Sequence, residues 1–287
     1  MAAIVIDGKA IAAKLLEDVR LRVAELKKTG VLPCLAVILV GEDPGSVSYV
    51  KAKQKALTEA GMDGWDLTLH ETAPEAELHT LIARLNADER VHGILVQLPL
   101  PAHINEDRII RAIDPHKDVD CFHPLSMGKL LMGQPGFLPC TPHGVLVLLK
   151  EMKIPVSGSQ VVIVGRSNIV GKPLAMLLAR KEYNATVTIC HTGTKDLASY
   201  TRMADILIAA AGSPGLITGD MIKPGAAVID VGVNAIIGTH LHSHLVGDVL
   251  FDEAQETAGW ITPVPGGVGP MTIAMLMHNV LHAAEGK

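Results

Sequence analysis

The chain has 287 residues, of which 48% are hydrophobic and 19% charged, so it can bury a sizeable core and global disorder is excluded. Only 3% of the residues are aromatic and the formal net charge is -5, which argues against a protein that binds nucleic acid through stacking or a basic surface. A small anionic ligand in a local basic pocket is compatible with this balance.

The cysteines are Cys34, Cys121, Cys140 and Cys190, which lie far apart in the sequence and form no CxxC pair. We therefore expect neither a disulfide framework nor a cysteine-based zinc site, and a reducing compartment fits this usage. The N-terminal segment has no basic stretch before its apolar run, and Asp7 and Lys9 interrupt that run, so no secretory signal is expected. No apolar run approaches the roughly 18 residues of a membrane span. These features predict a soluble cytoplasmic protein.

The predicted elements alternate between buried strands and amphipathic helices. Apolar runs rich in β-branched residues predict strands at 34–41, 93–100, 161–165, 186–190, 205–212 and 226–232. Helical patterns lie at 8–28, 46–60, 74–86, 170–180 and 271–284, with a further helix in the segment TPHGVLVLLKEM. Such alternation predicts an α/β fold with parallel sheets that helices cover on both faces.

The chain is expected to divide near residues 121–150 into two α/β domains with a ligand cleft between them. We assign residues 1–140 and a returning C-terminal helix at 271–287 to the first domain. Residues 141–270 then form the second domain, for which the strand-rich stretch after Gly158 predicts a Rossmann-type parallel sheet.

The segment VVIVGRSNIVGKPLAMLLAR predicts a strand, a glycine turn and a helix, with Gly165 ending the strand and Gly171 following in the turn. A helix that begins here offers free backbone N–H groups to a phosphate. The GxGxxG spacing is absent, so an ordinary βα connection and a phosphate site both stay open on this turn alone. A P-loop is disfavoured, because one residue too many separates the glycines and Pro173 replaces the magnesium-binding Ser or Thr.

The next strand, at 186–190, predicts which dinucleotide is bound. An NAD site usually carries an acid at this strand's end, whereas here HTGTK follows and no acid precedes Asp196. Arg166, in the first glycine turn, could meet a 2′-phosphate, because a guanidinium binds phosphate and a carboxylate repels it. NADP is therefore favoured over NAD, the alternative for Arg166 being a solvated surface arginine.

Tyr49 and Lys53 are four residues apart on the predicted helix 46–60, for which Ser46 is a plausible N-cap. Lys53 lies on the apolar stripe of this helix, whereas Lys51 and Lys55 point away. One interpretation is a lysine that extends its ammonium from the edge of the stripe to solvent. The other is a partly desolvated lysine whose amine takes part in proton transfer.

Gln97 interrupts the predicted strand 93–100 near its carboxyl end, which in an open α/β sheet faces the ligand crevice. A buried amide must be hydrogen-bonded, so a core role and a functional role both remain open. The following segment KDVDC offers Asp118 and Asp120 in a loop, where carboxylates more often cap turns.

Taken together, these segments resemble the bifunctional methylenetetrahydrofolate dehydrogenase/cyclohydrolase family. The matching stretches include VGEDPGSVSYVKAKQKA, GILVQLPLP, PHKDVDCFHP, PCTPHGV, GRSNIVGKP, VIDVGVN, GDV and PGGVGPMT, in the order the family has them. The resemblance implies oxidation of 5,10-methylenetetrahydrofolate by NADP and hydrolysis of the methenyl product to 10-formyltetrahydrofolate.

By the same resemblance, Lys53 matches the catalytic lysine of the family, with Tyr49 and Gln97 as its companions. Asp120 matches the residue that hydrogen-bonds the pterin ring. The residues that match positions lining the folate site of the family are Leu98, Pro99, Pro265 and Gly269.

For the cofactor, the resemblance places Gly165, Arg166 and Ser167 in the NADP turn. Thr192 stands where many members have Ser, and its hydroxyl could still reach the 2′-phosphate. Val233 matches a position that contacts the nicotinamide end. A homodimer is also implied.

The sequence departs from the family pattern at three places. KDVD is usually followed by Gly and here by Cys121, and GDV is followed by Leu250 where an acid is common. In HLHSH, the residues His240, His242 and His244 alternate as metal ligands can, but no partner for their second ring nitrogens is evident, so no metal is expected.

Two other functions fit part of the pattern, namely a shikimate-type NADP dehydrogenase and a non-catalytic nucleotide-sensing module. Neither has a reason to carry Tyr49, Lys53 and Gln97 together with KDVD.

Overall fold

The structure is a computed structural model that describes residues 2–237 and 243–286. It confirms the α/β class. Contacts divide the chain into two compact units, one comprising the residues up to Ala12 together with Thr141–Thr272, and the other Ala13–Cys140 together with the segment from Ile273. The predicted boundary had assigned the first residues to the other half. They belong with the larger sheet because Ile4 and Val5 pair with Trp260 and Ile261.

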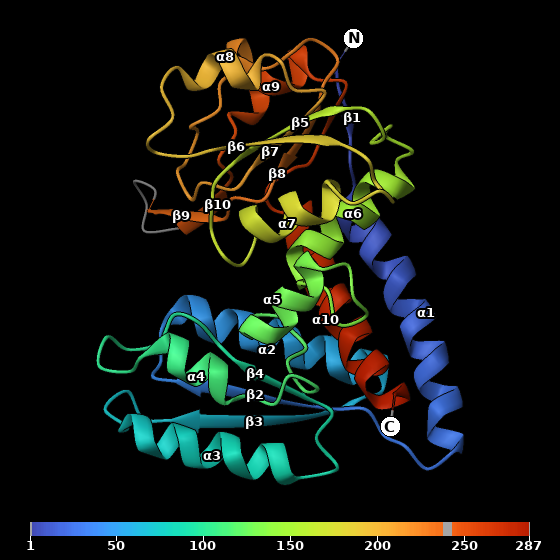
Figure 1. The fold of residues 1–287 in the computed structure, drawn as a ribbon, viewed down its shortest axis with the longest axis vertical. Helices are drawn as coiled ribbons and strands as arrows, with labels where there is room; N and C mark the ends of the chain where they lie inside the picture. Colours follow the sequence, from blue (N-terminus) through green and yellow to red (C-terminus); the bar gives the residue numbers. More distant parts are fainter. Residues whose placement is uncertain (1, 238–242, 287) are drawn as a thin grey trace. The chain divides into compact units, whose positions relative to one another are not determined.

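The unit that contains Lys53 is built on a parallel three-stranded sheet in the order β3-β2-β4 (Figure 1). Its strands are β2 (Cys34–Val40), β3 (Asp63–Leu69) and β4 (Gly93–Val96). Its helices include α2 (Pro44–Ala60), α3 (Glu75–Ala87), α4 (Glu106–Ala112) and α5 (Pro124–Leu131), and most of α1 (Gly8–Lys28) and α10 (Val268–Glu285). Alternate residues of β2 pack against α3 and α4, where Ile38, Ile82 and Ile109 are fully buried.

Three details of this unit differ from the sequence-based prediction. Strand β4 ends at Val96 rather than at residue 100, because the prolines at 99 and 101 cannot continue a ladder. Ser46 is not the N-cap of α2, since the helix begins at Pro44 and Asp43 accepts a hydrogen bond from the Ser46 backbone N–H at 2.8 Å. Strand β3 was not predicted, because it lies at the sheet edge and its polar residues interrupt the apolar pattern.

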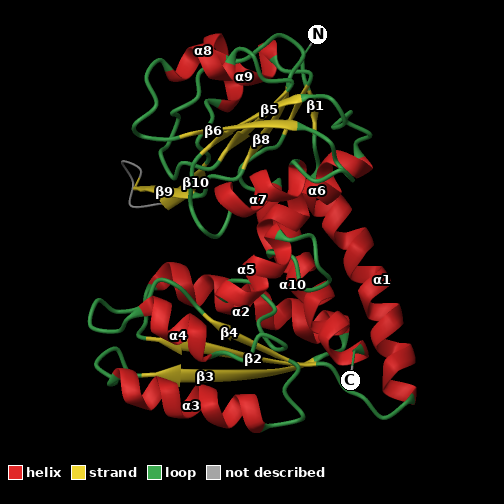
Figure 2. Cartoon of the chain, viewed as in Figure 1, coloured by secondary structure: helices red, strands yellow, loops and turns green. Residues whose placement is uncertain are grey.

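The other unit holds a parallel six-stranded sheet in the order β1-β11-β8-β7-β5-β6. Figure 2 shows this sheet in yellow, with β1, β5, β6 and β8 labelled. Its strands are β1 (Ile4–Val5), β5 (Gln160–Val164), β6 (Thr186–Cys190), β7 (Ile206–Ala209), β8 (Ala227–Asp230) and β11 (Trp260–Ile261). A separate antiparallel pair consists of β9 (Asn234–Ile237) and β10 (Ser243–Val246). The helical elements are α6 (Cys140–Glu151), α7 (Gly171–Leu178), α8 (Leu197–Thr201), η1 (Gly219–Met221) and α9 (Phe251–Thr257).

The chain order β5, β6, then back across β5 to β7 and β8 makes this a Rossmann-type sheet. The order reverses next to β5, so a crevice for a dinucleotide is expected outside the carboxyl ends of these strands. Val164, Leu207 and Val228 lie in the buried core that one face of the sheet forms. Within the described ranges, no helix is long and apolar enough to cross a lipid bilayer.

A buried lysine fixes the loop that carries KDVD. Lys117 is only 5% exposed, and its Nζ donates to the carbonyl oxygens of Leu85, Asn86 and Asp88 at 2.8–2.9 Å. A positive charge at a helix C-terminus also interacts favourably with the helix dipole. Because the Lys117 carbonyl accepts the Ile94 N–H at 2.8 Å, the end of α3, strand β4 and the KDVD loop are tied together.

A buried carboxyl group fixes the carboxyl end of β8. Asp230 is 3% exposed and accepts the backbone N–H groups of Gly232, Asp248 and Val249 at 2.9–3.0 Å. Burial raises the pKa of Asp230 to about 6, and the charge of Asp248 adds to the rise while the three backbone bonds oppose it.

We predict that Lys117→Met lowers the free energy of unfolding by about 2–3 kcal/mol, because three carbonyl groups at the end of α3, one buried and two partly buried, lose their donor. Urea denaturation followed by circular dichroism measures the change. The control is Lys150→Met at an exposed position of α6, for which we expect less than about 0.5 kcal/mol. Equal effects of the two substitutions would contradict the role assigned to Lys117.

We also predict a pH-dependent contribution from Asp230. Its folded-state pKa lies above the ordinary value near 3.8, so the folded protein keeps a proton that the unfolded chain releases. Asp230 therefore adds about 3 kcal/mol to the free energy of unfolding below about pH 4. This contribution is lost as the pH rises to about 6. The free energy of unfolding of the wild type minus that of Asp230→Asn should fall over this range and then stay level. A difference independent of pH would contradict the shift.

Candidate functional site

The structure brings Lys53 and Gln97 together. Lys53 lies half-buried on α2, and its Nζ donates to Gln97 Oε1 at 2.9 Å. Gln97 directly follows β4, and its Nε2 donates to the Leu98 carbonyl at 2.7 Å. This second bond fixes the orientation of the amide, so that its oxygen faces the lysine. Of the two interpretations of Lys53, an ammonium that simply extends into solvent is disfavoured by this bond.

Tyr49 lies one turn before Lys53 on α2, with 42% of its surface exposed. Burial of the remainder raises the pKa of its phenol, so the hydroxyl stays protonated at neutral pH. A half-exposed ring beside a lysine offers both an apolar face for an aromatic ligand and a hydroxyl donor.

Asp120 is electrostatically coupled to Lys53. Burial raises the pKa of the Asp120 carboxyl, the positive charge of Lys53 opposes the rise, and the charge of Asp118 adds to it. The Cys140 thiol donates to Asp120 Oδ1 at 3.6 Å, and burial raises the pKa of this thiol well above its usual range. A carboxyl group, an amine and an amide thus converge from one unit of the chain, and the phenol of Tyr49 lies one helical turn from the amine.

The structure shows that the two acids of KDVD, Asp118 and Asp120, have different hydrogen-bond partners, which the sequence alone could not reveal. Asp118 is 2% exposed and accepts the backbone N–H groups of Phe122 and His123 and the hydroxyl of Ser126, at 2.6–3.0 Å. Its carboxylate therefore shapes the start of α5. Asp120 makes none of these bonds, and apart from the Cys140 thiol on Oδ1 no described residue bonds to its carboxyl group, so Oδ2 is left for a ligand.

Cys121 occupies a backbone conformation that favours glycine. Its φ is 61°, in the left-handed region, and its side chain is fully buried. The thiol donates to the Phe137 carbonyl at 3.1 Å. The positive φ gives a physical reason for the glycine that usually follows KDVD. In this chain the position holds Cys121, which adopts this φ less readily than glycine and whose thiol makes the hydrogen bond to Phe137.

The four expected folate-lining positions lie in two units of the chain. Leu98 and Pro99 share a cis peptide bond directly after Gln97. Pro265 follows Val264 through a second cis bond, and Gly269 lies in the first turn of α10, where a Cβ would meet open space.

Gly165 directly follows β5 and lies close to the end of the neighbouring strand β7. Its φ is 136°, and a Cβ at this position would collide with the carbonyl oxygen of Ala210, the residue after β7. The backbone therefore comes close enough for a ligand's phosphates to meet the turn. Ser167 accepts the N–H groups of Val170 and Gly171 at 3.1 and 3.4 Å, which orders the start of α7.

The expected phosphate-binding side chains are exposed. Arg166 makes no ion pair or hydrogen bond with any residue in the described part of the chain, and Thr192 is likewise exposed. Beyond the carboxyl end of β6 lies a cavity of about 400 Å³ that Lys195, His191 and Tyr200 line without an acid. This donor set suits the extra phosphate of NADP better than the bare ribose hydroxyls of NAD. Lys195 was not singled out from the sequence, although its position in HTGTK could have pointed to it.

Val233, expected near the nicotinamide, is 42% exposed and lies between β8 and β9. His240 and His242 lie outside the described residues, as does the side chain of His244. Among the residues that the structure describes, no group of His, Cys, Asp and Glu is arranged to hold a metal ion.

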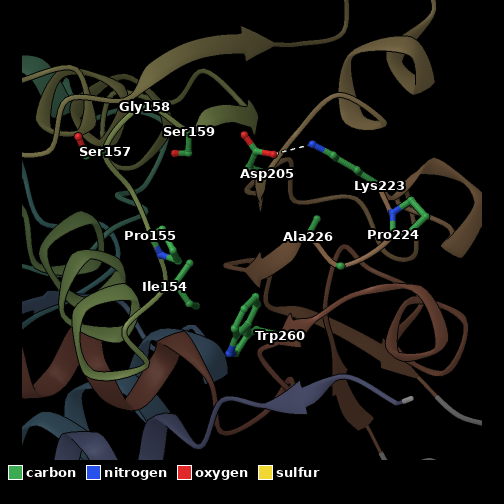
Figure 3. A pocket seen from close by; sticks show the side chains of 11 residues that line it. Ile154, Pro155, Ser157, Gly158, Ser159, Asp205, Lys223, Pro224, Ala226 and Trp260 are labelled. Carbon is green, nitrogen blue, oxygen red and sulfur yellow. Dashed lines mark hydrogen bonds and ion pairs between the residues drawn. The ribbon is translucent and has the colours of Figure 1, made fainter.

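A second cavity, of about 390 Å³, lies at the opposite edge of the same sheet (Figure 3). It is lined at the amino ends of β5, β7 and β8, and Trp260 forms one wall. Lys223 Nζ and Asp205 Oδ1, which both line it, form an ion pair at 2.6 Å. Because dinucleotides bind at carboxyl ends of parallel strands, this cavity is not the candidate cofactor site.

Comparisons with known proteins agree with this arrangement. The family model described as "Tetrahydrofolate dehydrogenase/cyclohydrolase, catalytic domain" matches residues 6–120. The model described as "Tetrahydrofolate dehydrogenase/cyclohydrolase, NAD(P)-binding domain" matches residues 139–287. The "Bifunctional protein FolD" of Exiguobacterium sibiricum is 57% identical over 283 residues, which cover 99% of this chain and all of that protein.

Solved structures give the same result. The bifunctional FolD methylenetetrahydrofolate dehydrogenase/cyclohydrolase of Campylobacter jejuni has a TM-score of 0.95 at 49% identity, with 99% of each chain covered. The methylenetetrahydrofolate dehydrogenase-cyclohydrolase of Trypanosoma brucei, solved with NADP and an inhibitor, has a TM-score of 0.96 at 40% identity, covering 100% of this chain and 98% of that one. The chain therefore belongs to the tetrahydrofolate dehydrogenase/cyclohydrolase family.

Proposed function

We propose that this chain oxidises 5,10-methylenetetrahydrofolate to the methenyl form with NADP and then hydrolyses it to 10-formyltetrahydrofolate, with Lys53 as the acid–base group of the second step. The observation that carries the proposal is the hydrogen bond between Lys53 and Gln97, in electrostatic contact with Asp120. Family membership supplies the two reactions, and these side chains supply the groups that the second one needs.

In the first step, bound NADP would supply the acceptor for the hydride that leaves the methylene carbon, and electron density from the folate nitrogens would assist that departure. The chain's own task is to hold both reactants in line and to exclude water. Gly165, Arg166, Ser167, Thr192 and Val233 are proposed to hold the cofactor. Among these residues, Arg166 has the strongest structural support as a cofactor-binding residue. Its guanidinium is exposed and makes no competing ion pair within the described ranges.

In the second step, water attacks the cationic methenyl carbon. A neutral Lys53 amine can keep one N–H on Gln97 and use its lone pair to take the proton from that water. The same proton then passes to the folate nitrogen that leaves, while the carbinol oxygen releases its remaining proton to solvent and becomes the formyl carbonyl. No proton is gained or lost at Lys53 over the cycle, and one proton is released for each cation hydrolysed. Gln97 suits this task because it fixes the amine without adding a charge.

The folate is proposed to be held by groups around the lysine. The Asp120 carboxyl would accept hydrogen bonds from the pterin, and Tyr49 would pack on the aromatic linker. Leu98, Pro99, Pro265 and Gly269 are proposed to line the rest of the site.

The assembly and location of the protein remain predictions. We propose a homodimer and a cytoplasmic location, on the resemblance and on the cysteine usage respectively. Sedimentation velocity and a tagged chain in intact cells measure them.

The overall activity is tested by incubating the protein with methylenetetrahydrofolate and NADP while reduced nicotinamide and formyl product are followed. Formation of both products supports the proposal. Tight NADP binding without turnover would favour the nucleotide-sensing alternative.

Lys53→Met should lower the rate of methenyltetrahydrofolate hydrolysis by about 100-fold or more, the usual scale of general acid–base catalysis. The control is Lys55→Met on the same helix, because Lys55 is 76% exposed and pairs with Glu59 instead. Loss of the methenyl absorbance measures hydrolysis in both variants. Near-normal hydrolysis by the Lys53 variant would contradict the assignment of Lys53 as the acid–base group.

Arg166→Ala should abolish most of the preference for NADP over NAD, because the 2′-phosphate loses its guanidinium partner. The matched control is Lys172→Ala in the first turn of α7, since the Lys172 ammonium is already bonded to Asn168 Oδ1 at 2.7 Å. The ratio of kcat/KM for the two dinucleotides is the measurement. An unchanged ratio would mean that other residues recognise the 2′-phosphate.

A further inference from the structure

A fully buried carboxylate lies beside the proposed cofactor site without a role so far. Asp248, in the segment GDV, is 0% exposed. Its Oδ2 accepts the backbone N–H groups of Ala211 and Gly212 at 2.6 and 2.9 Å. Its Oδ1 accepts the Ser213 N–H at 2.8 Å and the Asn234 Nδ2 at 2.9 Å. Four donors thus surround one carboxylate, and both oxygens are fully used.

Asp248 holds two segments of the chain, and each of them comes after one of two neighbouring strands. Ala211–Ser213 follows β7, and Asn234 follows the loop after β8, so both segments lie beyond carboxyl ends in a parallel sheet. The first segment continues from Ala210, whose carbonyl packs directly on Gly165. The second is adjacent in sequence to Val233. Asp248 therefore connects the glycine turn with the part of the site proposed for the nicotinamide.

The surroundings leave little freedom for this carboxylate. A Cβ at Gly232 would collide with Asp248 Oδ1, and the Asp248 backbone N–H is held by Asp230 Oδ1 at 3.0 Å. All four partners of the side chain are donors, so only a group with two acceptor oxygens satisfies them. An asparagine would direct an NH₂ group at one pair of these donors and repel it.

We propose that Asp248 is a positioning residue for the hydride-transfer step, which fixes Ala211–Ser213 and the Val233–Asn234 segment so that the nicotinamide end of NADP is held in line. The inference rests on the proposed function, because it concerns the same cofactor site. It adds a residue that touches neither reactant and acts through the loops it holds.

The bifunctional chain provides an internal control for the test. Hydrolysis of added methenyltetrahydrofolate needs no NADP, whereas the dehydrogenase step does. In full-length Asp248→Asn we expect the dehydrogenase kcat to fall by about 10- to 100-fold, as small misplacements of reacting groups do. Hydrolysis should stay within about twofold, and the NADP dissociation constant within about threefold, since phosphate contacts elsewhere dominate binding.

Asp252→Asn is the matched control, because Asp252 is exposed in the first turn of α9, and it should change neither activity. Asn234→Ala is a milder second variant in case Asp248→Asn does not fold, since it removes one donor and leaves the three backbone donors in place. We expect the same selective loss in the dehydrogenase step, of about threefold to tenfold.

Three outcomes overturn the inference or its basis. An unchanged ratio of dehydrogenase to hydrolase activity in the folded variants removes the positioning role. A parallel fall of both activities would mean that Asp248 only stabilises the folded chain, and this also contradicts the positioning role. A wild-type chain that shows neither activity overturns the proposed function itself, which is a result distinct from the other two.

Discussion

The hydrogen bond between Lys53 and Gln97 is the contact on which the proposed chemistry depends. It joins a helix to the end of a strand, and each partner is fixed from its own side. The lysine has a defined place because α2 packs its apolar stripe on the small sheet, where Leu57 is 1% exposed. The amide has a defined orientation because the chain turns directly after β4. A base placed in this way needs no reorganisation before it meets water.

The same requirement, that buried polar groups find partners, organises the loops around the site. Lys117 donates to carbonyl groups at the end of α3, Asp118 accepts N–H groups at the start of α5, and Asp248 accepts those that follow β7. Each is a charged residue that is almost completely buried, and each is paired with groups of opposite polarity. The loops that border the proposed ligands are thus held by internal charges rather than by apolar packing alone.

Sequence patterns predicted the central strands well, because a strand buried on both faces is a continuous apolar run, as in β2, β5 and β8. They failed for β3, an edge strand whose polar residues face solvent, and for β1 and β11, which are two residues long. Local rules likewise chose Ser46 over Asp43 as the helix cap. The rules could name Lys53, Gln97 and Asp120 as candidates, but only the fold reveals that Asp118 is a loop support and that Asp248 has four donors.

The pairing of the first residues with the large sheet has a practical consequence. Ile4 and Ile6 donate backbone hydrogen bonds to Gly259 and Ile261, so the N-terminal strand forms an edge of the sheet that carries the dinucleotide turn. The helix that follows at once, α1, runs mainly with the lysine-bearing unit. A fusion partner or a deletion at the N-terminus would therefore disturb the edge of the cofactor sheet first, and an affinity tag for purification is better attached after α10.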